Sequence, residues 1–162
     1  MYKKVDNLKF EDVRIIFRNF SGEATKYNRA GNRNFCVVIE DQAMASALIE
    51  EGWNVKTLRP RDEDEEPKYY LPVTVNFEYN PPSIYLLCGK KRTVLDESSI
   101  STLDHAEFKN VDLIVRPYSW EVNDKSGIKG YLKTMYVTIE EDALAKKYAD
   151  FEEYEGDEDF PF

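Results

Sequence analysis

Apolar and polar residues alternate along several short stretches of this chain, and this period-two pattern is the feature that most limits its fold. The clearest case is residues 70–79, where every second residue from position 71 is apolar: Leu71, Val73, Val75 and Phe77. Such alternation is typical of a β-strand with one buried face, because successive side chains of a strand point to opposite sides. The sequence therefore predicts a sheet that covers one core.

Similar stretches predict six or seven strands in all. The others lie at residues 8–18, 35–39, 53–58, 84–88, 111–120 and 128–139. Because Asn80, Pro81 and Pro82 form a turn signal, we expect residues 84–88 to pair with residues 70–79 as a hairpin. The pattern also assigns faces. It puts Val13, Ile15 and Phe17 on one side of the first strand, and it puts Lys129, Tyr131, Lys133 and Met135 on one side of the last.

Helices are predicted only at three short places. Residues 42–51 have helical spacing between an Asp41 cap and a Gly52 stop. Asp96 is expected to cap a short helix that ends at Leu103, and residues 140–148 form a last helix. Strands and helices do not alternate regularly. This order favours a mostly β fold, a small antiparallel barrel or sandwich with helical insertions, over a doubly wound sheet.

The negative charge of the chain is concentrated at its end. The whole sequence has 31 acidic and 22 basic residues, a formal charge of −9. Residues 150–162 contain seven acids and no base, which leaves residues 1–149 at 24 acids and 22 bases, a charge of −2. We therefore expect a folded domain at 1–149 and an acidic, mobile tail at 150–162.

The tail ends in residues that a partner protein could hold. These are Asp157, Glu158, Asp159, Phe160, Pro161 and Phe162. A basic, apolar pocket would suit this combination of acids and rings. The alternative interpretation is a tail that only keeps the protein soluble.

Several classes of function lack support in the sequence. There is no apolar segment of membrane-spanning length and no signal peptide, so we expect a cytoplasmic protein. Cys36 and Cys88 are expected to be lone reduced thiols, and the single His105 has no metal-ligand spacing around it. No nucleophile, phosphate-loop or metalloprotease motif is present, so we expect no enzyme activity, no metal and no cofactor.

Basic and aromatic residues occur together at three places, as binding of a single-stranded polynucleotide requires. The first group is Arg14, Arg18, Phe20, Lys26, Tyr27, Arg29 and Arg33; the second is Lys90, Lys91 and Arg92; the third is Arg116, Tyr118, Trp120, Lys125, Lys129, Tyr131 and Lys133. The basic side chains would bind phosphates, and the aromatic rings would stack on nucleobases. Tyr27, Tyr118, Trp120 and Tyr131 are the best stacking candidates, because each lies in or beside a turn or a basic face.

A core role for these rings is the alternative. It assigns Phe17, Phe35, Trp53, Phe77 and Tyr136 to the core and treats the bases as ordinary surface residues. If the binding hypothesis holds, the acidic tail resembles a nucleic-acid backbone in charge. We then expect it to compete with a polynucleotide for the basic groove.

The sequence resembles known families. The ending DEDFPF is similar to the acidic tip of bacterial single-stranded DNA-binding proteins, with Phe160 where an aliphatic residue is usual. The body resembles a bacteriophage family of single-stranded DNA-binding proteins through three segments: IIFRNFSGEATKYNRAGNRNFCVVIE, GWNVKTLRPR and VDLIVRPYSWEVNDKSGIKGYLKTMYVTIEED. This resemblance implies an OB-fold that coats single-stranded DNA in phage replication, recombination or repair, inside the host cytoplasm, with the tail recruiting replication proteins.

Two other functions remain open from the residues alone. One is an adaptor that docks a partner protein through its tail and never binds nucleic acid; a weaker one is a carboxylate-dependent nuclease. The sequence also leaves open whether the protein is a monomer or a homodimer and whether it prefers DNA or RNA.

Overall fold

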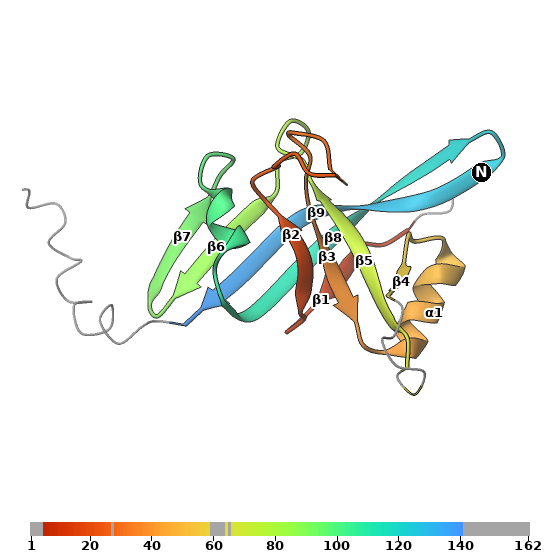
Figure 1. The fold of residues 1–162 in the computed structure, drawn as a ribbon, viewed down its shortest axis with the longest axis horizontal. Coiled ribbons are helices and arrows are strands. Elements are labelled where there is room, and N and C mark those ends of the chain that lie inside the picture. Colours follow the sequence, from red (N-terminus) through yellow and green to blue (C-terminus); the bar gives the residue numbers. More distant parts are fainter. Residues whose placement is uncertain (1–4, 27, 59–63, 65, 141–162) are drawn as a thin grey trace, which may run out of the picture.

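The computed structural model describes residues 5–26, 28–58, 64 and 66–140. These residues form nine strands, one α-helix and one short 3-10 helix (Figure 1). The strands are β1 (Leu8–Phe10), β2 (Ile15–Asn19), β3 (Arg33–Ile39), β4 (Lys56–Leu58), β5 (Lys68–Val75), β6 (Ser83–Cys88), β7 (Lys91–Leu95), β8 (Phe108–Val122) and β9 (Lys125–Ile139). The helices are α1 (Gln42–Glu51) and η1 (Ile100–Asp104).

Five strands surround the core as a partly open barrel in the order β2-β3-β5-β9-β8. Their pairings are antiparallel except for β5 and β9, which are parallel. The barrel closes where the backbone N–H of Val13 donates to the Val111 carbonyl at 3.0 Å. A partly open five-stranded barrel is the architecture of the OB-fold, so the predicted mostly β, OB-like fold class is confirmed.

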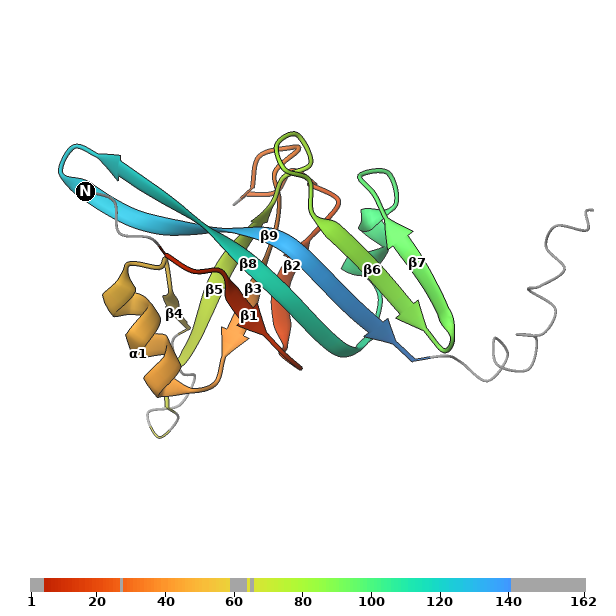
Figure 2. The same cartoon turned by 180° about the vertical axis from the view of Figure 1, so that it is seen from behind.

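Strands β8 and β9 form a long hairpin that extends beyond the barrel, at the upper left of Figure 2. Asn123 and Asp124 make its turn with positive φ angles of 49° and 66°. Positive φ at both central residues is what a type I′ turn requires, and Asn and Asp tolerate it. The turn matches the twist of the two strands and so favours a long hairpin.

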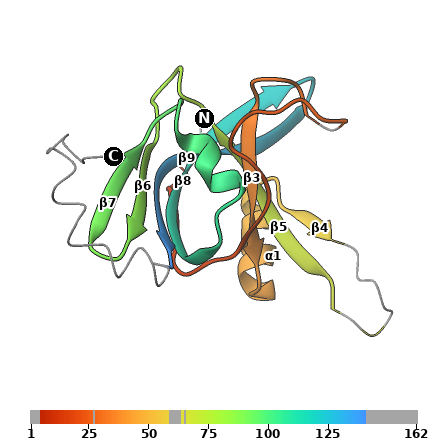
Figure 3. The ribbon, with the colours of Figure 1, turned by 60° about the vertical axis from the view of Figure 1, so that its left-hand side comes forward.

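The other strands extend the sheet at the edges of the barrel. Strand β1 pairs with β8, β4 pairs with β5, and the β6–β7 hairpin joins β9 through a parallel β6–β9 pairing. In Figure 3 the β6–β7 hairpin stands on one side of β8 and β9, while α1 and β4 lie on the other. Among the described residues, no helix has both the length and the apolar character needed to cross a membrane.

The core is made of inward-facing side chains of the barrel strands and of residues from the helices, the outer strands and the connecting segments. The largest fully buried side chains include Phe35 of β3, Leu71 of β5 and Met135 of β9. Phe20 stacks on Phe35 with ring centroids 5.0 Å apart. Leu103 of η1 and Trp53 also belong to this core.

Two bulges change which side chains face the core. Between Ile16 and Asn19 the β2–β3 register shifts, and Phe17 has a φ of 53°. Ile15 is therefore buried as predicted, but Phe17 is exposed and Phe20 is buried instead. The face predicted for Phe17 is wrong because the extra residue of a bulge reverses the alternation after it.

The second bulge lies in the β8–β9 pairing, where Ile114 pairs with Thr134 and Val115 pairs with Leu132. Lys133 is the extra residue. Leu132 and Met135 are both buried, so Met135 does not share a face with Lys129 and Tyr131 as the alternation predicted. The bulge lets β9 keep its apolar side toward the core at both of its ends.

The helix prediction for residues 42–51 is confirmed at both ends. The Asp41 side chain accepts hydrogen bonds from the backbone N–H groups of Ala43 and Met44, and Gly52 ends the helix with a φ of 112°. The second predicted helix is shorter than expected. Asp96 accepts from the N–H groups of Ser98 and Ser99, and only η1 follows. The predicted helix at 140–148 and the tail at 150–162 lie outside the described residues, except for Glu140.

The predicted hairpin between residues 70–79 and 84–88 is wrong. Strand β6 pairs with β7 through a turn at Gly89 and Lys90, and on its other side it pairs with β9. Residues 91–95 were not predicted as a strand, because their basic residues suggest a loop. The parallel partner of β6 lies about fifty residues away in sequence, and local patterns cannot reveal such a pairing.

Both cysteines are free, as predicted. Burial raises the pKa of the Cys36 thiol to about 11, and the nearby Lys56 offsets only part of this effect. The folded protein therefore keeps Cys36 protonated well above pH 9.

We expect the Cys88→Ala variant, in which Cys36 is the only thiol, to react slowly with iodoacetamide when folded. At pH 8 the thiolate population should be about one hundredfold below that of the same chain in denaturant, because two pKa units separate the two states. Alkylation followed by mass spectrometry measures both rates. Equal rates in the folded and unfolded states would contradict the burial of this thiol.

Candidate functional site

One face of the β8–β9 hairpin carries most of the third predicted group. The directly paired residues are Arg116 with Tyr131, Tyr118 with Lys129, Trp120 with Gly127, and Val122 with Lys125. Paired residues project to the same side of a sheet, and so do residues two apart along each strand. We call this side the hairpin face and define it by Arg116, Tyr118, Trp120, Lys125, Gly127, Lys129 and Tyr131.

The rings of the hairpin face are accessible from solvent. Tyr118 is 56% exposed and Trp120 is 39% exposed. Tyr118 meets Tyr131 edge to face at a centroid distance of 5.8 Å, and the Lys129 ammonium lies 5.3 Å from the centre of the Tyr131 ring. Lys129, Tyr131 and Tyr118 therefore lie within contact distance of one another on this surface.

Gly127 gives the Trp120 ring its position. A Cβ atom at residue 127 would lie 2.9 Å from Cζ2 and 3.0 Å from Nε1 of Trp120. Only glycine therefore lets the indole lie directly across β9. Glycine inside a strand often marks such a close approach.

A groove continues from the hairpin face over β5. Thr74 pairs with Tyr131 across the parallel β5–β9 contact. Two hollows of about 270 and 310 Å³ lie here, and both are bordered by Thr74 and Lys129. Arg33 and Tyr131 line the first hollow, and Trp120 lines the second. We call these two hollows together the β5–β9 groove.

Arg33 borders the groove, but part of its guanidinium serves the fold. Its Nη1 donates to the Phe20 carbonyl at 2.8 Å, and its Nη2 lies 3.6 Å from Oε1 of Glu97. The Arg33 side chain is only 17% exposed. Arg33 thus brings positive charge to the groove wall while fixing the loop before β3.

That loop, between β2 and β3, is ordered by asparagine side chains. Asn28 donates to the carbonyls of Glu23, Arg29 and Asn32, and the Gly31 N–H donates to the Gly22 carbonyl at 2.8 Å. Lys26 and Arg29 are exposed on this loop, whose end at Gly31 and Asn32 borders the groove. Tyr27 lies outside the described residues.

Two members of the first predicted group, Phe20 and Arg18, contact other parts of the fold. Phe20 is fully buried, so its prediction as a nucleobase contact is wrong. Arg18 donates from Nη1 to the carbonyls of Leu103 and Ala106 at 3.0 and 2.6 Å, and it packs 4.4 Å from the centre of the Phe108 ring. It ties β2 to the segment before β8 and lies apart from the groove.

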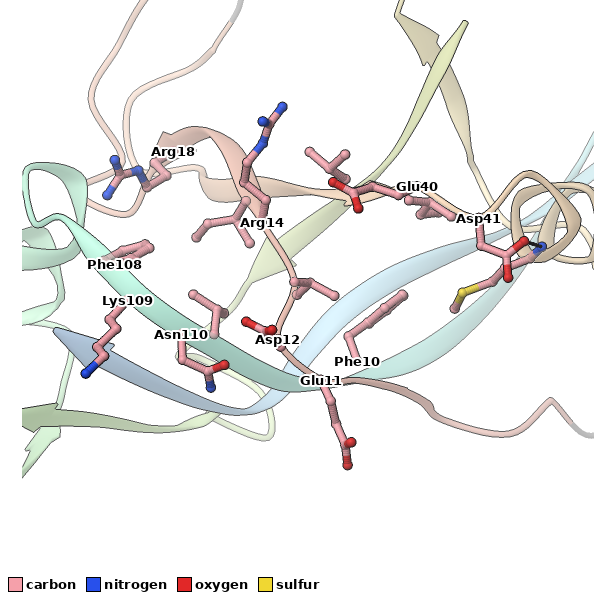
Figure 4. Close-up of a pocket in the computed structure, with 16 residues that line it drawn as sticks. Phe10, Glu11, Asp12, Arg14, Arg18, Glu40, Asp41, Phe108, Lys109 and Asn110 are labelled. Carbon is pink, nitrogen blue, oxygen red and sulfur yellow. Dashed lines mark hydrogen bonds between the residues drawn. The ribbon is translucent and has the colours of Figure 1, made fainter. Parts of the chain in front are cut away.

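Arg14 is exposed and borders a different hollow, of about 550 Å³, where β2 and β8 separate (Figure 4). The charged side chains around it have both signs: Glu11, Asp12, Glu40 and Asp41 against Arg14, Arg18 and Lys109. This excess of acids makes the hollow a poor site for a polyanion.

The second group lies far from the hairpin face. Lys90, Lys91 and Arg92 are exposed at the turn and start of β7, where Cys88 pairs with Ile139 at the end of β9. The hairpin face belongs to the beginning of β9 and the end of β8. Lys133 is exposed at the bulge between these two regions.

Sequence reasoning missed three residues that shape the groove: Thr74, Gly127 and Gly130. Gly130 is needed because a Cβ atom there would lie 2.8 Å from Cγ1 of Val115. Two glycines three residues apart within a predicted strand could have indicated close packing at this place. Thr74 gave no signal, because its role depends on the distant pairing with Tyr131.

The described residues contain no group of three or more His, Cys, Asp or Glu side chains arranged to hold a metal ion. Hydrogen bonds from the Ser98 and Ser99 side chains lower the pKa of Asp96, which lies at the turn after β7 and outside the groove. The groove is lined by Arg33, Lys129, rings and neutral polar groups, together with two acids, Glu78 and Glu97. Glu97 is the one that pairs with Arg33.

Comparison with protein families gives one match over nearly the whole chain. Residues 1–160 match the model of a phage ssDNA-binding domain. The comparison with curated proteins gives no match.

Three similar solved structures are of a single-stranded DNA-binding protein from bacteriophage Enc34. The one in complex with ssDNA has a TM-score of 0.55 and 14% identity, covering 87% of this chain and 95% of that chain. The protein without ssDNA gives 0.52 and 13%, covering 87% and 89%. A C-terminal truncation gives 0.53 and 14%, covering 87% and 94%. At these identities the likeness establishes a common fold.

The Gly127→Ala variant should displace the Trp120 ring, because the added methyl group would lie 2.9 Å from Cζ2 of Trp120. We expect a changed tryptophan emission spectrum and near-UV circular dichroism. Stability should fall only modestly, since Trp120 is partly exposed and its ring can move outward. Ser83→Ala, at an exposed position of β6, is the control and should leave both spectra unchanged. Identical spectra for both variants would contradict the assigned ring position.

Proposed function

The chain belongs to the phage ssDNA-binding domain family, and we propose that it binds single-stranded DNA without catalysis along the hairpin face and the β5–β9 groove. The observation that carries this proposal is the gathering of exposed rings and bases on one face of one hairpin, directly beside a groove. Both ingredients of sequence-independent strand binding thus occur together.

The position of this surface on the barrel also supports the proposal. OB-folds commonly bind oligonucleotides over the second and third barrel strands, between the loop joining strands one and two and the loop joining strands four and five. Those strands are β3 and β5 here, and the two loops are the asparagine-ordered loop and the β8–β9 turn. This argument is an analogy of fold, and the side chains supply the chemistry.

In the proposed complex, cations and rings have separate roles. Arg116, Lys125 and Lys129 bind phosphates, with Arg33 at the groove wall and Lys26 and Arg29 on the loop whose end borders the groove. Nucleobases stack on the rings of Trp120, Tyr118 and Tyr131. Because every base has a flat face, such stacking gives affinity with little sequence preference.

We further propose the role that the sequence indicates: the domain at 1–149 coats and protects single-stranded DNA during phage replication, recombination or repair in the host cytoplasm. The tail at 150–162 recruits replication proteins through Asp157–Phe162 and competes with DNA for the groove. Geometry permits this competition. The 22 residues after Glu140 span up to about 70 Å when extended, whereas residues 129 and 139 of β9 are about 33 Å apart at strand spacing.

Alanine at Trp120 or at Tyr118 should weaken oligo-dT binding by about 1–3 kcal/mol, the usual contribution of one base–ring stack. The melting temperature should change little, since both rings are partly exposed. Ile49→Ala, an exposed apolar position on α1, is the control and should leave affinity unchanged. If both ring variants lose stability while keeping full affinity, these rings are structural and do not stack on DNA.

Titration of oligo-dT at two salt concentrations tests the function itself. For full-length protein, the logarithm of affinity should fall with that of salt concentration by about 0.7 per phosphate contacted. A variant that ends at residue 149 should bind oligo-dT more tightly at low salt, because the competing acids are gone. Absence of binding in both forms, together with tail-dependent capture of a replication protein, would instead support the adaptor function.

A further inference from the structure

A second cluster of rings and bases lies at the other end of β9. Tyr85 of β6 pairs directly with Tyr136 of β9, and their rings stack with centroids 4.9 Å apart and planes 19° from parallel. The Arg92 guanidinium lies over the Tyr85 ring, 4.2 Å from its centre. Cation, ring and ring thus form one continuous surface.

This stack is on the solvent side of β9. Met135 and Val137 point into the core, so Tyr136 between them points outward and is 40% exposed. At the other end of the strand, Lys129 and Tyr131 point outward between buried Ile128, Gly130 and Leu132. Both ring clusters therefore belong to the outer surface of one strand. The positions of Tyr131 and Tyr136 are about 17 Å apart at strand spacing.

Charge of both signs borders the second stack: Asp112 of β8 pairs directly with Tyr136, and the basic turn lies on the β7 side. Lys90 and Lys91 are exposed at the turn that leads into Arg92. In the part of the chain that the structure describes, the two salt bridges are Lys9–Glu11 and Arg33–Glu97, so the three bases of this turn take part in neither. Their charge remains available to an anionic ligand.

We propose that Tyr85, Tyr136, Arg92 and Lys90 form a second contact surface for single-stranded DNA, separate from the β5–β9 groove. This inference rests on the proposed function and extends it. A DNA strand long enough to leave the groove at Tyr131 reaches this surface along β9. There it stacks a nucleobase on Tyr136 and places phosphates beside the turn. A strand that only fills the groove does not reach it.

An acidic peptide is the competing occupant of the same surface. Ile139, the last residue of β9, pairs with Cys88 beside the basic turn. Charge alone would suit either ligand. The stacked, exposed ring favours nucleic acid, because a flat base covers it better than a run of carboxylates does.

The test compares short and long oligonucleotides on the full-length chain. Single OB-fold sites cover about 4–16 nucleotides, so an oligo-dT of about 6 can fill only one site and one of about 30 exceeds it. Affinities for both are measured for the wild type, for the double variant Lys90→Glu/Arg92→Glu and for Tyr136→Ala. The control is Lys56→Glu/Lys68→Glu, which makes the same charge change at exposed positions of β4 and β5. Circular dichroism melting identifies any variant that has lost its fold.

We expect the turn variant to bind the long oligonucleotide about tenfold more weakly and Tyr136→Ala about fivefold more weakly. Binding of the short one should change less than about twofold. Unchanged long-strand affinity, or an equal loss at both lengths, would overturn the second surface. Tighter binding of the long oligonucleotide by the turn variant would also overturn the second surface. It would indicate that the turn binds an acidic peptide instead. If the wild type binds neither oligonucleotide, the proposed function itself fails and this surface fails with it.

Discussion

The rest of this structure depends on the pairing of β9 with three other strands. It is antiparallel to β8 along its whole length, parallel to β5 at Gly130 and Tyr131, and parallel to β6 from Thr134 to Ile139. Such crowding explains the absence of a side chain at Gly130, where the Val115 methyl group occupies the space. Because all three neighbours fix the rotation of β9 about its axis, they also fix which of its side chains face solvent.

The bulge at Lys133 connects this constraint to the surface chemistry. Without the extra residue, one end of β9 would turn its apolar residues outward, since a one-residue shift exchanges the two faces of a strand. With it, Tyr131 and Tyr136 both point outward while Leu132 and Met135 stay buried. A chain with a formal charge of −9 can thus present rings and bases together on a local surface. The electrostatic argument concerns this surface and not the whole protein.

The sequence predicted those parts that depend on local patterns. Helix α1 follows from its capping residues. The outward-facing residues of the hairpin face follow from alternation along β8 and β9 and from the turn between them. Phe20 was misassigned because a bulge at Phe17 turns it into the core. The carbonyl partners of Arg18, more than eighty residues away, were not predictable from local patterns. The parallel neighbours of β9 were not predictable for the same reason, and with them the groove at Thr74 and the Tyr85–Tyr136 stack.

The fluorescence of Trp120 gives the most direct test of the central claim, that the solvent face of the β8–β9 hairpin binds single-stranded DNA. The chain has two tryptophans, and the other, Trp53, is buried. In a Trp53→Phe variant whose fold is verified by circular dichroism, only Trp120 reports. We expect saturable quenching by oligo-dT at low salt that is reversed by added salt. Unchanged Trp120 emission while the oligonucleotide is bound would contradict the account.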